Sequence, residues 1–381
     1  MHNNISLSAY HPTVAQIDLD AFHGNVNRLK KVAPKSKLMA VVKTNAYGHG
    51  VVPISQEAVR AGADRLGVTT VEEGALLREN GIRTPIQILS SIPPRQAEDV
   101  VTYELIPSIS SFPLANAISK AAIKQKKIIS VHLKIDTGLH RFGIDPSVAV
   151  QFCTACYYLP GLDWEGIYTH FPNPDEGDFV TTERQCHLFM NTVEKLQQYG
   201  FSFPIQHVGG STIAIESPNM HLDMVRPGIA LFGYTPAPRQ ENMITLKPVM
   251  HLKSELVQVR ELPPDTPVGY GGNYVTKSFE KIAIVPIGHG DGYKKSLVNK
   301  GEMLVGGRRA KIIGSISQDQ TLINVTDIPG ISAGDEVVLL GKQGKDEITA
   351  REVAGWMNSI VDEVVSSLTE RIRRVYVRGI E

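Results

Sequence analysis

The stretch Lys37-Leu-Met-Ala-Val-Val-Lys43-Thr-Asn-Ala-Tyr-Gly-His-Gly50 decides the fold, because it joins an apolar run to a lysine and a glycine-rich turn. The six residues before Lys43 predict a buried strand, and the run 55–61, stopped by Gly62, predicts a helix after the turn. The same alternation of short strands and amphipathic helices continues to about residue 235. It indicates a parallel sheet covered by helices, which is an α/β fold.

Eight strands follow from this rhythm. They are predicted at residues 37–42, 66–69, 86–90, 105–109, 129–135, 162–169, 205–208 and 228–232. Helices are predicted at 71–80, 114–125 and 183–198 among others, with Gly81 and Gly200 placed to end two of them. Eight such units in about 220 residues fit a closed (β/α)8 TIM-type barrel, although the rhythm alone also allows an open doubly wound sheet.

After Pro236-Ala-Pro238 the pattern changes to short strands joined by Gly and Pro turns. Strands are predicted at residues 251–259, 281–286, 302–305, 310–316, 321–325 and 336–340, and near 374–377 after a helical run at 349–368. This pattern is typical of a mainly antiparallel β domain. We therefore expect a barrel at residues 1–240 and a β domain at 241–381.

The composition excludes several classes of partner. The 381 residues carry 39 Lys and Arg against 39 Asp and Glu, so the formal charge is zero. We therefore expect neither nucleic acid nor a membrane surface as a partner. The three cysteines favour a reducing compartment, with the cytoplasm as the default, and the pair Cys153 and Cys156 is expected to pack within a helix. The spacing of the histidines predicts no metal site.

Lys43 is the first residue with a candidate chemical role. In a barrel it would lie at the mouth, where active sites form. An ammonium flanked by apolar strand residues is partly removed from water, which suits a lysine to Schiff-base chemistry with an aldehyde. Most lysines at strand ends are simply solvated, so the neighbouring residues decide between the two interpretations.

The run from Ala40 to Gly50 resembles the cofactor-lysine motif of the bacterial alanine racemases, which use pyridoxal 5'-phosphate. Six further blocks resemble the family in the same order over nearly the whole chain. They are HLKIDTGLHR at 132–141, GIYTHF at 166–171, RPGIALFGY at 226–234, VGYG at 268–271, GDGY at 290–293 and RIRRVY at 371–376. The family's architecture, a barrel followed by a β domain, agrees with the pattern above.

The resemblance implies an isomerase that interconverts L- and D-alanine and supplies D-alanine for peptidoglycan. It implies that Lys43 holds the cofactor aldehyde and serves as one acid/base. Tyr270 would serve the opposite face of the substrate, because racemisation needs a proton removed on one side and returned on the other. In the family this tyrosine comes from the neighbouring subunit and is hydrogen-bonded by the match of His170. We therefore expect a homodimer with a shared site.

The resemblance also assigns the remaining contacts of the cofactor. Arg226 would face the pyridine nitrogen, where a permanent charge discourages ring protonation and side reactions. His207 would support Arg226 from behind. The phosphate would be held by hydroxyl and backbone N–H groups rather than by a cluster of cations. The matching positions are Tyr47, Ser211, Gly228, Ile229 and Tyr376.

Two basic residues match the family's substrate-binding positions. Arg141 would bind the carboxylate of the amino acid. Lys134 matches a lysine that is carbamylated in many members and that holds this arginine in place. A lysine within the predicted strand would otherwise be an awkward buried charge, although it could also face outward into solvent.

The chain departs from the family pattern at several positions that concern the substrate. Gln318 stands in place of a methionine before Asp319, and His289 in place of a tyrosine. Gly210 and Gly269 replace a commoner Asn and Ser. These exchanges make the predicted substrate wall more polar, and hydrophobic pockets discriminate weakly against an added hydroxyl. Serine or other small polar amino acids are therefore possible substrates besides alanine, with Gln318 at the substrate and His289 and Asp319 in support.

Other interpretations stay open from the sequence. A broader-specificity or serine racemase would share every block. An amino-acid decarboxylase of the same fold would commonly use a cysteine in the second domain, where this chain has Ser317. A non-catalytic pyridoxal phosphate-binding protein would lack the second domain, and therefore Tyr270 and Tyr376.

Overall fold

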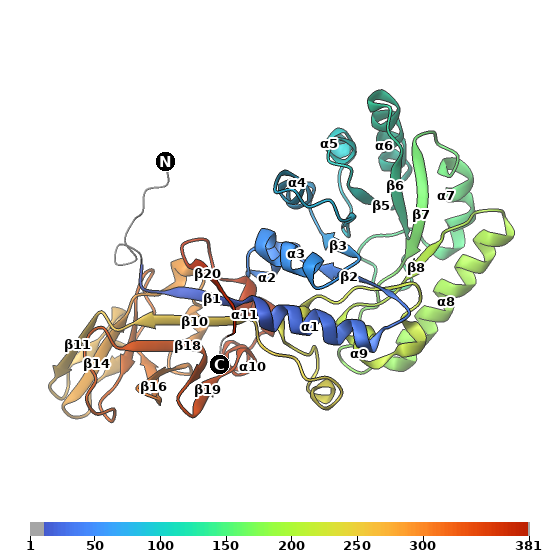
Figure 1. The fold of residues 1–381 in the computed structure, drawn as a ribbon. Coiled ribbons are helices and arrows are strands. Elements are labelled where there is room, and N and C mark those ends of the chain that lie inside the picture. The colour runs from blue at the N-terminus through green and yellow to red at the C-terminus, as the bar shows by residue number, and fades with distance from the viewer. Residues whose placement is uncertain (1–10, 380–381) are drawn as a thin grey trace. The chain divides into compact units, whose positions relative to one another are not determined.

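Eight parallel strands between residues 37 and 225 form one sheet, as a computed structural model that describes residues 11–379 shows (Figure 1). The chain divides into two units, which we describe separately. The barrel unit is Ala21–Lys247. The β unit is Pro248–Glu381 together with the segment that ends at Asp20. The predicted start of the barrel domain at residue 1 lies outside the described residues.

The barrel sheet has the order β8-β7-β6-β5-β4-β3-β2-β9. Its strands are β2 (Lys37–Val41), β3 (Arg65–Val68), β4 (Ile86–Ile88), β5 (Ile106–Ile109), β6 (Ile129–Lys134), β7 (Leu162–Tyr168), β8 (Ile205–His207) and β9 (Met224–Val225). The edges β8 and β9 also meet, because the backbone N–H of Asp223 donates to the carbonyl of Gln206 at 3.1 Å and that of Arg226 to Gly209 at 3.3 Å. The predicted barrel is therefore confirmed over the open sheet.

The eighth strand was placed wrongly by the sequence pattern. Seven predicted strands coincide with β2 to β8, but residues 229–232 form the 3₁₀ turn η5 (Ile229–Phe232), and the eighth strand is β9. Pro227 and Gly228 end the strand, since Pro has no N–H to donate and Gly228 leaves the extended region with ψ near −94°. The apolar run after them is buried as a turn, with Phe232 packed against Phe22 at 5.6 Å between ring centres.

Helices cover the outside of the barrel (Figure 1). They are α1 (Leu19–Val32), α3 (Val51–Arg60), α4 (Val71–Glu79), α5 (Ala97–Thr102), α6 (Phe112–Gln125), α7 (Ala149–Cys156) and α8 (Phe179–Gln198), with the short α2 (Lys43–Tyr47) and α9 (Ser211–Glu216) at strand ends. The side chains of Thr70, Ser111 and Asp178 accept the N–H groups that start α4, α6 and α8. Gly81 and Gly200 stop α4 and α8 with φ of 80° and 87°, as predicted.

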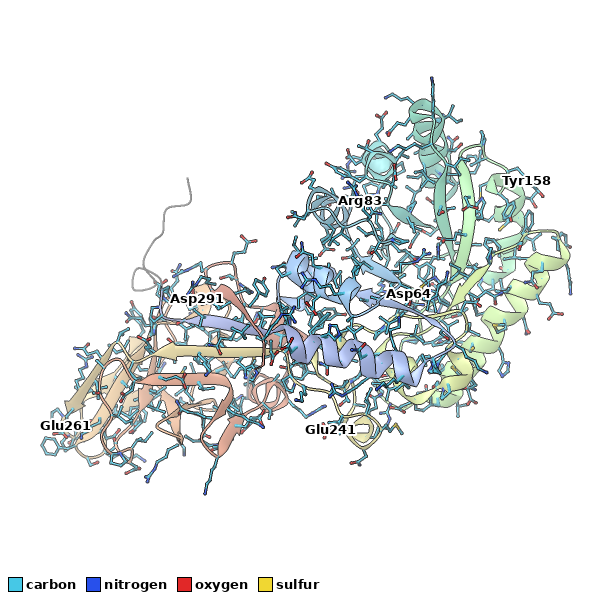
Figure 2. The ribbon with its side chains drawn as sticks, viewed as in Figure 1. Asp64, Arg83, Tyr158, Glu241, Glu261 and Asp291 are labelled. Carbon is cyan, nitrogen blue, oxygen red and sulfur yellow. The ribbon has the colours of Figure 1, made fainter. Side chains whose placement is uncertain are left out.

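The cysteine pair packs within α7. Cys153 and Cys156 are fully buried, and burial raises the pKa of both thiols to about 12. The thiols are therefore protonated and unreactive, which agrees with the packing role predicted for them. By contrast, Tyr158, just beyond the helix, is 78% exposed at the outer surface of the barrel unit (Figure 2).

The β unit is built on one sheet of mainly antiparallel strands, in the order β11-β14-β17-β16-β15-β18-β10-β1-β20 with β19 beside β18. Its strands are β1 (Val14–Asp18), β10 (Met250–Glu255), β11 (Gln258–Leu262), β14 (Glu280–Val285), β15 (Glu302–Val305), β16 (Arg308–Ile313), β17 (Thr321–Asn324), β18 (Glu336–Gln343), β19 (Asp346–Ile348) and β20 (Arg373–Val377). The helices α10 (Ala350–Met357) and α11 (Val361–Ser366) and the hairpin β12 (Pro267–Val268) and β13 (Tyr274–Val275) complete it.

Strand β1 lies in this sheet, although the predicted boundaries placed residues 14–18 with the barrel. It pairs antiparallel with β10 and parallel with β20, and Ala15 and Ile17 are fully buried there. Alternating apolar residues predict a strand with one buried face but not the sheet to which it belongs. In this sheet β1 lies between β10 and β20 and pairs with both of them.

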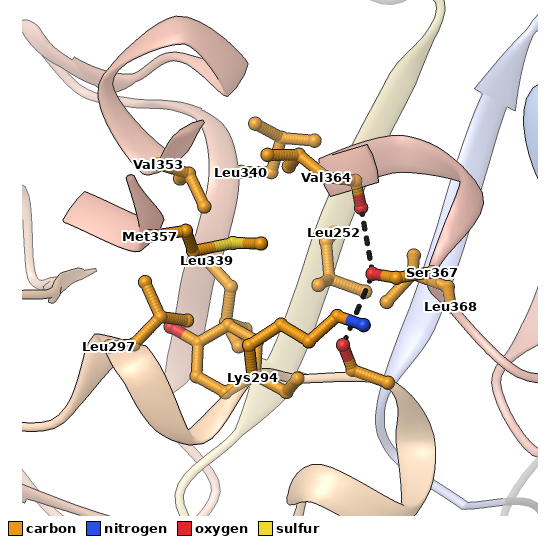
Figure 3. Close-up of a pocket in the computed structure, with 12 residues that line it drawn as sticks. Leu252, Lys294, Leu297, Leu339, Leu340, Val353, Met357, Val364, Ser367 and Leu368 are labelled. Atoms are coloured by element: carbon orange, nitrogen blue, oxygen red, sulfur yellow. Dashed lines mark hydrogen bonds between the residues drawn. The ribbon is translucent and has the colours of Figure 1, made fainter. Parts of the chain in front are cut away.

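A small cavity lies in the β unit between β10, β18, α10 and α11 (Figure 3). Its volume is ≈ 20 Å³, and its lining is mostly aliphatic, including Leu252, Leu297, Leu340 and Val353. Such a space is too small for an organic ligand, so it is a packing gap of the core.

Among residues 11–379 no helix is both long and apolar enough to cross a membrane.

Candidate active site

Lys43 follows β2 and begins a turn of unusual geometry. The next four residues, Thr44, Asn45, Ala46 and Tyr47, have φ of 56°, 52°, 53° and 51°, in the left-handed region. Each non-glycine residue in this region costs roughly 1–2 kcal/mol. The turn therefore exists because surrounding contacts hold it.

The Glu73 carboxylate on α4 supplies those contacts. One oxygen accepts the backbone N–H of Thr44 at 2.5 Å and of Asn45 at 3.3 Å, and the other accepts the N–H of Thr69 at 3.0 Å. The Asn45 side chain accepts the N–H of Val51 at 2.8 Å, which ties the turn to α3. Glu73 thus joins the ends of β2 and β3 and fixes the backbone beside Lys43.

The turn directs Tyr47 into the barrel mouth. Its ring packs against Phe232 at 5.0 Å, and the Lys43 ammonium lies 5.6 Å from the ring centre. A Cβ at Gly228 would clash with the Tyr47 hydroxyl, so only glycine allows this approach. The Ser211 hydroxyl accepts the N–H of Gly228 at 3.0 Å and of Ala230 at 3.3 Å, which leaves its own proton to donate.

These groups fit a phosphate monoester. Two hydroxyls, Tyr47 and Ser211, meet the backbone of residues 228–230 at the ends of the last barrel strands, a common place for phosphate in this fold. The glycine at 228 keeps the space clear of side chains. Within the described residues there is no cluster of His, Cys, Asp or Glu placed to hold a metal ion.

Arg226 lies at the centre of the mouth and is 4% exposed. Its guanidinium donates to His207 Nδ1 at 2.8 Å, to His170 Nδ1 at 3.1 Å and to the carbonyls of Thr169 and Val208. Burial lowers its pKa to about 10, which still leaves it charged at neutral pH. No carboxylate appears among these partners, so they do not neutralise its charge.

Arg226 fixes the tautomers of the two histidines that it contacts. A guanidinium can only donate, so Nδ1 of His207 and of His170 must be unprotonated acceptors. Burial and the charge of Arg226 hold the pKa of both imidazoles well below its ordinary value. Each ring is therefore neutral, with its one proton on Nε2.

Lys134 at the end of β6 is buried, with 1% exposure. Its ammonium donates to the Ile135 carbonyl at 2.6 Å and lies 5.5 Å from the ring centre of Phe142. Arg141 is exposed and stacks on the same ring at 5.7 Å. Burial lowers the pKa of Lys134 to about 7. Both basic groups thus lie beside the Phe142 ring, and the burial of Lys134 excludes the alternative of an outward-facing lysine.

Lys134→Met is expected to stabilise the protein most at low pH. The pKa of Lys134 is about 7 in the folded chain against an ordinary 10.5, so the unfolded chain binds more protons between these values. The cost of the buried charge is thus fully present below pH 7 and declines as the pH rises toward 10.5. A gain of a few kcal/mol follows for the variant near pH 6 and a much smaller one near pH 10.

Urea unfolding of both proteins in CO₂-free buffer measures this difference. Lys120→Met is the matched control, because this lysine is exposed on α6. An equal gain for Lys134→Met at both pH values would contradict the buried-charge explanation.

Tyr270 lies in the β unit, in a loop after β12, and its side chain is 76% exposed. Gly269 before it has φ 74° and ψ −178°, which only glycine adopts readily, and this explains why glycine suits that position here. Ser315 holds the loop, because its hydroxyl donates to the Tyr270 carbonyl at 3.0 Å. The tyrosine is thus presented on a braced loop.

The predicted substrate-wall residues lie together in the β unit. The N–H of His289 donates to the Ser317 carbonyl and that of Gly290 to the Gln318 carbonyl, both at 2.9 Å. Arg371 pairs with Asp319 at 2.7 Å and with the buried Asp291 at 3.1 Å. The side chains of His289 and Gln318 are exposed, so both are accessible to a ligand.

The structure therefore gathers the predicted residues into two groups. One lies at the ends of the barrel strands and the other in turns of the β unit between residues 269 and 319, while Tyr376 lies separately on β20 and is 36% exposed. The sequence assigned no role to three residues of the site: Glu73, Phe142 and Tyr168. The Tyr168 ring lies 5.3 Å from the Arg226 guanidinium and 5.6 Å from the Lys134 ammonium. Phe142 directly follows the quoted 132–141 block, which is the signal that could have found it.

A (β/α)8 barrel with a lysine, a buried arginine and a set of hydroxyl and backbone N–H donors at its strand ends has the arrangement of a barrel enzyme, whose active site forms at that end. A family model described as the N-terminal domain of alanine racemase matches residues 17–236, and one described as the C-terminal domain matches residues 249–376. The chain belongs to the alanine racemase family. It is an isomerase that interconverts L- and D-alanine.

Named relatives agree over the whole chain. An alanine racemase from Halothermothrix orenii is 41% identical over 96% of this chain and 97% of its own. An alanine racemase structure from Clostridium difficile 630 matches with a TM-score of 0.92 and 32% identity, over 99% of this chain and 97% of its own. One from Bartonella henselae, described with covalently bound pyridoxal phosphate, matches with 0.86 and 26%, over 96% and 99%. The predicted family and fold are confirmed.

Proposed function

We propose that this racemase binds pyridoxal phosphate through Lys43. The observation that carries the proposal is the barrel mouth, where Lys43, Arg226 and a phosphate-sized set of donors lie at the ends of the strands. The Tyr47 and Ser211 hydroxyls and the backbone of Gly228 and Ile229 would hold the phosphate, with Tyr376 as a further donor. The Bartonella henselae relative is described with this cofactor. When bound, it supplies an electron sink that acidifies the α-proton of an amino acid.

Arg226 would face the pyridine nitrogen in this arrangement. Its pKa of about 10 keeps it charged at neutral pH, and its partners include two neutral imidazoles and two carbonyls. An uncompensated positive charge discourages protonation of the nitrogen it faces. The residue therefore limits electron withdrawal and favours proton return over other outcomes.

Lys43 and Tyr270 would move the α-proton on opposite faces of the substrate. A free phenol has a pKa near 10, so Tyr270 needs a donor that stabilises its anion. His170 offers one, because its Nδ1 accepts from Arg226 and its Nε2 carries the proton. We propose that Tyr270 reaches this donor from a second subunit, so that the enzyme is a homodimer with shared sites.

Arg141 would bind the substrate carboxylate, and Lys134 would position it. A lysine whose pKa is about 7 is partly neutral at physiological pH, and a neutral amine reacts with CO₂. A carbamate on Lys134 would carry a negative charge beside Arg141, on the same Phe142 ring. The product D-alanine would serve peptidoglycan synthesis, and the free cysteines suit the cytoplasm as the location.

Alanine is expected to be the main substrate, with serine accepted at kcat/KM within about 200-fold of it. The reason is that the exposed polar side chains of Gln318 and His289 offer hydrogen bonds to a hydroxyl. Full-length protein with pyridoxal phosphate is incubated with each L-amino acid, and the enantiomers are resolved by chiral chromatography. Gln318→Met should lower the serine rate and leave the alanine rate nearly unchanged.

Turnover of alanine alone would contradict the broader specificity and leave the racemase intact. Loss of the carboxyl group would instead indicate a decarboxylase. Binding of the cofactor without any exchange of the α-proton would indicate a binding protein.

A further inference from the structure

A line of hydrogen bonds runs from Arg226 across the barrel interior. Arg226 contacts His207 Nδ1 at 2.8 Å, and His207 Nε2 contacts His132 Nδ1 at 2.8 Å. His132 Nε2 then contacts the Glu165 carboxylate at 3.1 Å, and Arg65 contacts both oxygens of that carboxylate at 2.7 and 2.8 Å. Arg65 Nη1 also lies 3.3 Å from His132 Nε2. Both histidines are fully buried and Arg65 is 3% exposed. Residues from β3, β6, β7 and β8 thus form one chain behind Arg226.

The two ends of the line set the direction of every hydrogen bond in it. Arg226 can only donate, so His207 accepts at Nδ1 and donates from Nε2. His132 must then accept at Nδ1 and donate from Nε2, where the Glu165 carboxylate is the acceptor. Arg65 Nη1, 3.3 Å from the same nitrogen, therefore gives its proton to Glu165 at 2.8 Å and not to His132. The reverse direction would set the His207 Nδ1 proton against the Arg226 guanidinium at 2.8 Å.

The surrounding packing holds both rings in place. A Cβ at Gly166 would clash with the His132 ring, so β7 carries a glycine where the ring passes. Tyr168 stacks on His207 with ring centres 4.8 Å apart, and the Arg226 guanidinium lies 5.3 Å from the centre of the Tyr168 ring. The arrangement therefore has little freedom to reorganise.

We propose that His132, Glu165 and Arg65, together with His207, are positioning residues of Arg226. The line holds the guanidinium through neutral imidazoles, and the only carboxylate in it is balanced by Arg65. Arg226 is thereby fixed without losing its charge, whereas a carboxylate placed directly on it would cancel that charge. The consequence for catalysis rests on the proposed function, in which Arg226 faces the cofactor nitrogen.

The hydrogen-bond direction can be read by NMR of the full-length protein with ¹⁵N-labelled histidine rings, before and after addition of pyridoxal phosphate. His132→Gln and His207→Gln variants assign the signals. Both rings are expected to be neutral Nε2–H tautomers from pH 6 to 8. A proton on Nδ1 of either ring, or an imidazolium in this range, would overturn the proposal.

Arg65→Met tests the role of the line. His132 then faces the unbalanced charge of Glu165 on one side, with His207 and the charge of Arg226 on the other. Loss of Arg65 should raise the pKa of His132 and favour its imidazolium, whose second ring proton breaks the hydrogen bond from His207. The affinity for pyridoxal phosphate, measured by absorbance titration, should fall about tenfold, as for a lost hydrogen bond to a charged group.

Arg78→Met is the matched control, because Arg78 is a half-buried arginine of the same unit that donates to the carbonyls of Ile82, Thr84 and Tyr103. It should lower the melting temperature without changing either tautomer. Equal effects of the two variants on tautomers and cofactor affinity would overturn the positioning role. The tautomers are read without turnover. The assigned hydrogen-bond directions could therefore be correct even if the protein did not racemise alanine, and the protein could racemise alanine even if these directions were wrong.

Discussion

Lys43→Ala is expected to reduce racemisation of alanine by more than about 10⁴-fold, because it removes both the amine that would hold the cofactor and one of the two proton-transfer groups. The residue stands at the end of β2 on a turn held by Glu73, so its replacement leaves the surrounding contacts in place. Turnover is measured by chiral chromatography. Borohydride treatment of the wild-type protein with pyridoxal phosphate should attach the cofactor to the peptide that contains residue 43.

Lys37→Ala is the control, because this exposed lysine begins the same strand at its other end. It should keep both turnover and the labelled peptide. Small added amines should restore part of the activity of Lys43→Ala. Full turnover in that variant, or labelling elsewhere in the wild-type chain, would contradict the assigned role.

Tyr270→Phe is expected to slow racemisation by about 10² to 10⁴-fold, which is the usual contribution of a general acid or base. The loss should be asymmetric between the enantiomers. In D₂O the enantiomer whose α-proton faces Lys43 should still exchange that proton, while the other should not. Tyr274→Phe is the control, since this neighbouring hydroxyl donates to Glu280 at 2.6 Å and has no assigned role in the reaction. Equal loss of exchange from both enantiomers would contradict a two-base mechanism.

Mixing the two inactive variants tests whether the site is shared. If Lys43 and Tyr270 of one site come from different subunits, a mixed dimer of Lys43→Ala and Tyr270→Phe contains one intact site. Equal mixing should then restore up to about a quarter of the wild-type activity. If both residues act within one subunit, no mixed dimer has an intact site and activity stays absent.

Much of the barrel could be predicted from local patterns. Strands β2 to β8 are short apolar runs, and Gly81 and Gly200 end helices where the chain needs a positive φ. The prediction of the eighth strand was wrong because β9 has only two residues, and the longer apolar run lies just beyond it in η5. No strand was predicted at residues 14–18, and alternation there would identify a buried face but not the partner strands.

Some residues of the candidate site could likewise be predicted from the sequence, and others could not. Lys43, Arg226 and Ser211 stand in distinctive local motifs at strand ends and could be named from the sequence. Glu73 could not, because its carboxylate acts on the backbone of residues almost thirty positions earlier, a relation that only packing creates. His132, Glu165 and Arg65 each look like an ordinary polar residue within a strand.

The sequence by itself determined the family, the two-part architecture and the residue types available for the chemistry, because these depend on local periodicity and on motifs. Only the tertiary structure decided which histidine nitrogens carry protons, why Lys134 has a lowered pKa, and how Arg226 keeps its charge while buried. The physical reason is that these properties arise from distances between groups far apart along the chain. Closure of the barrel brings those groups to within about 3 Å of each other.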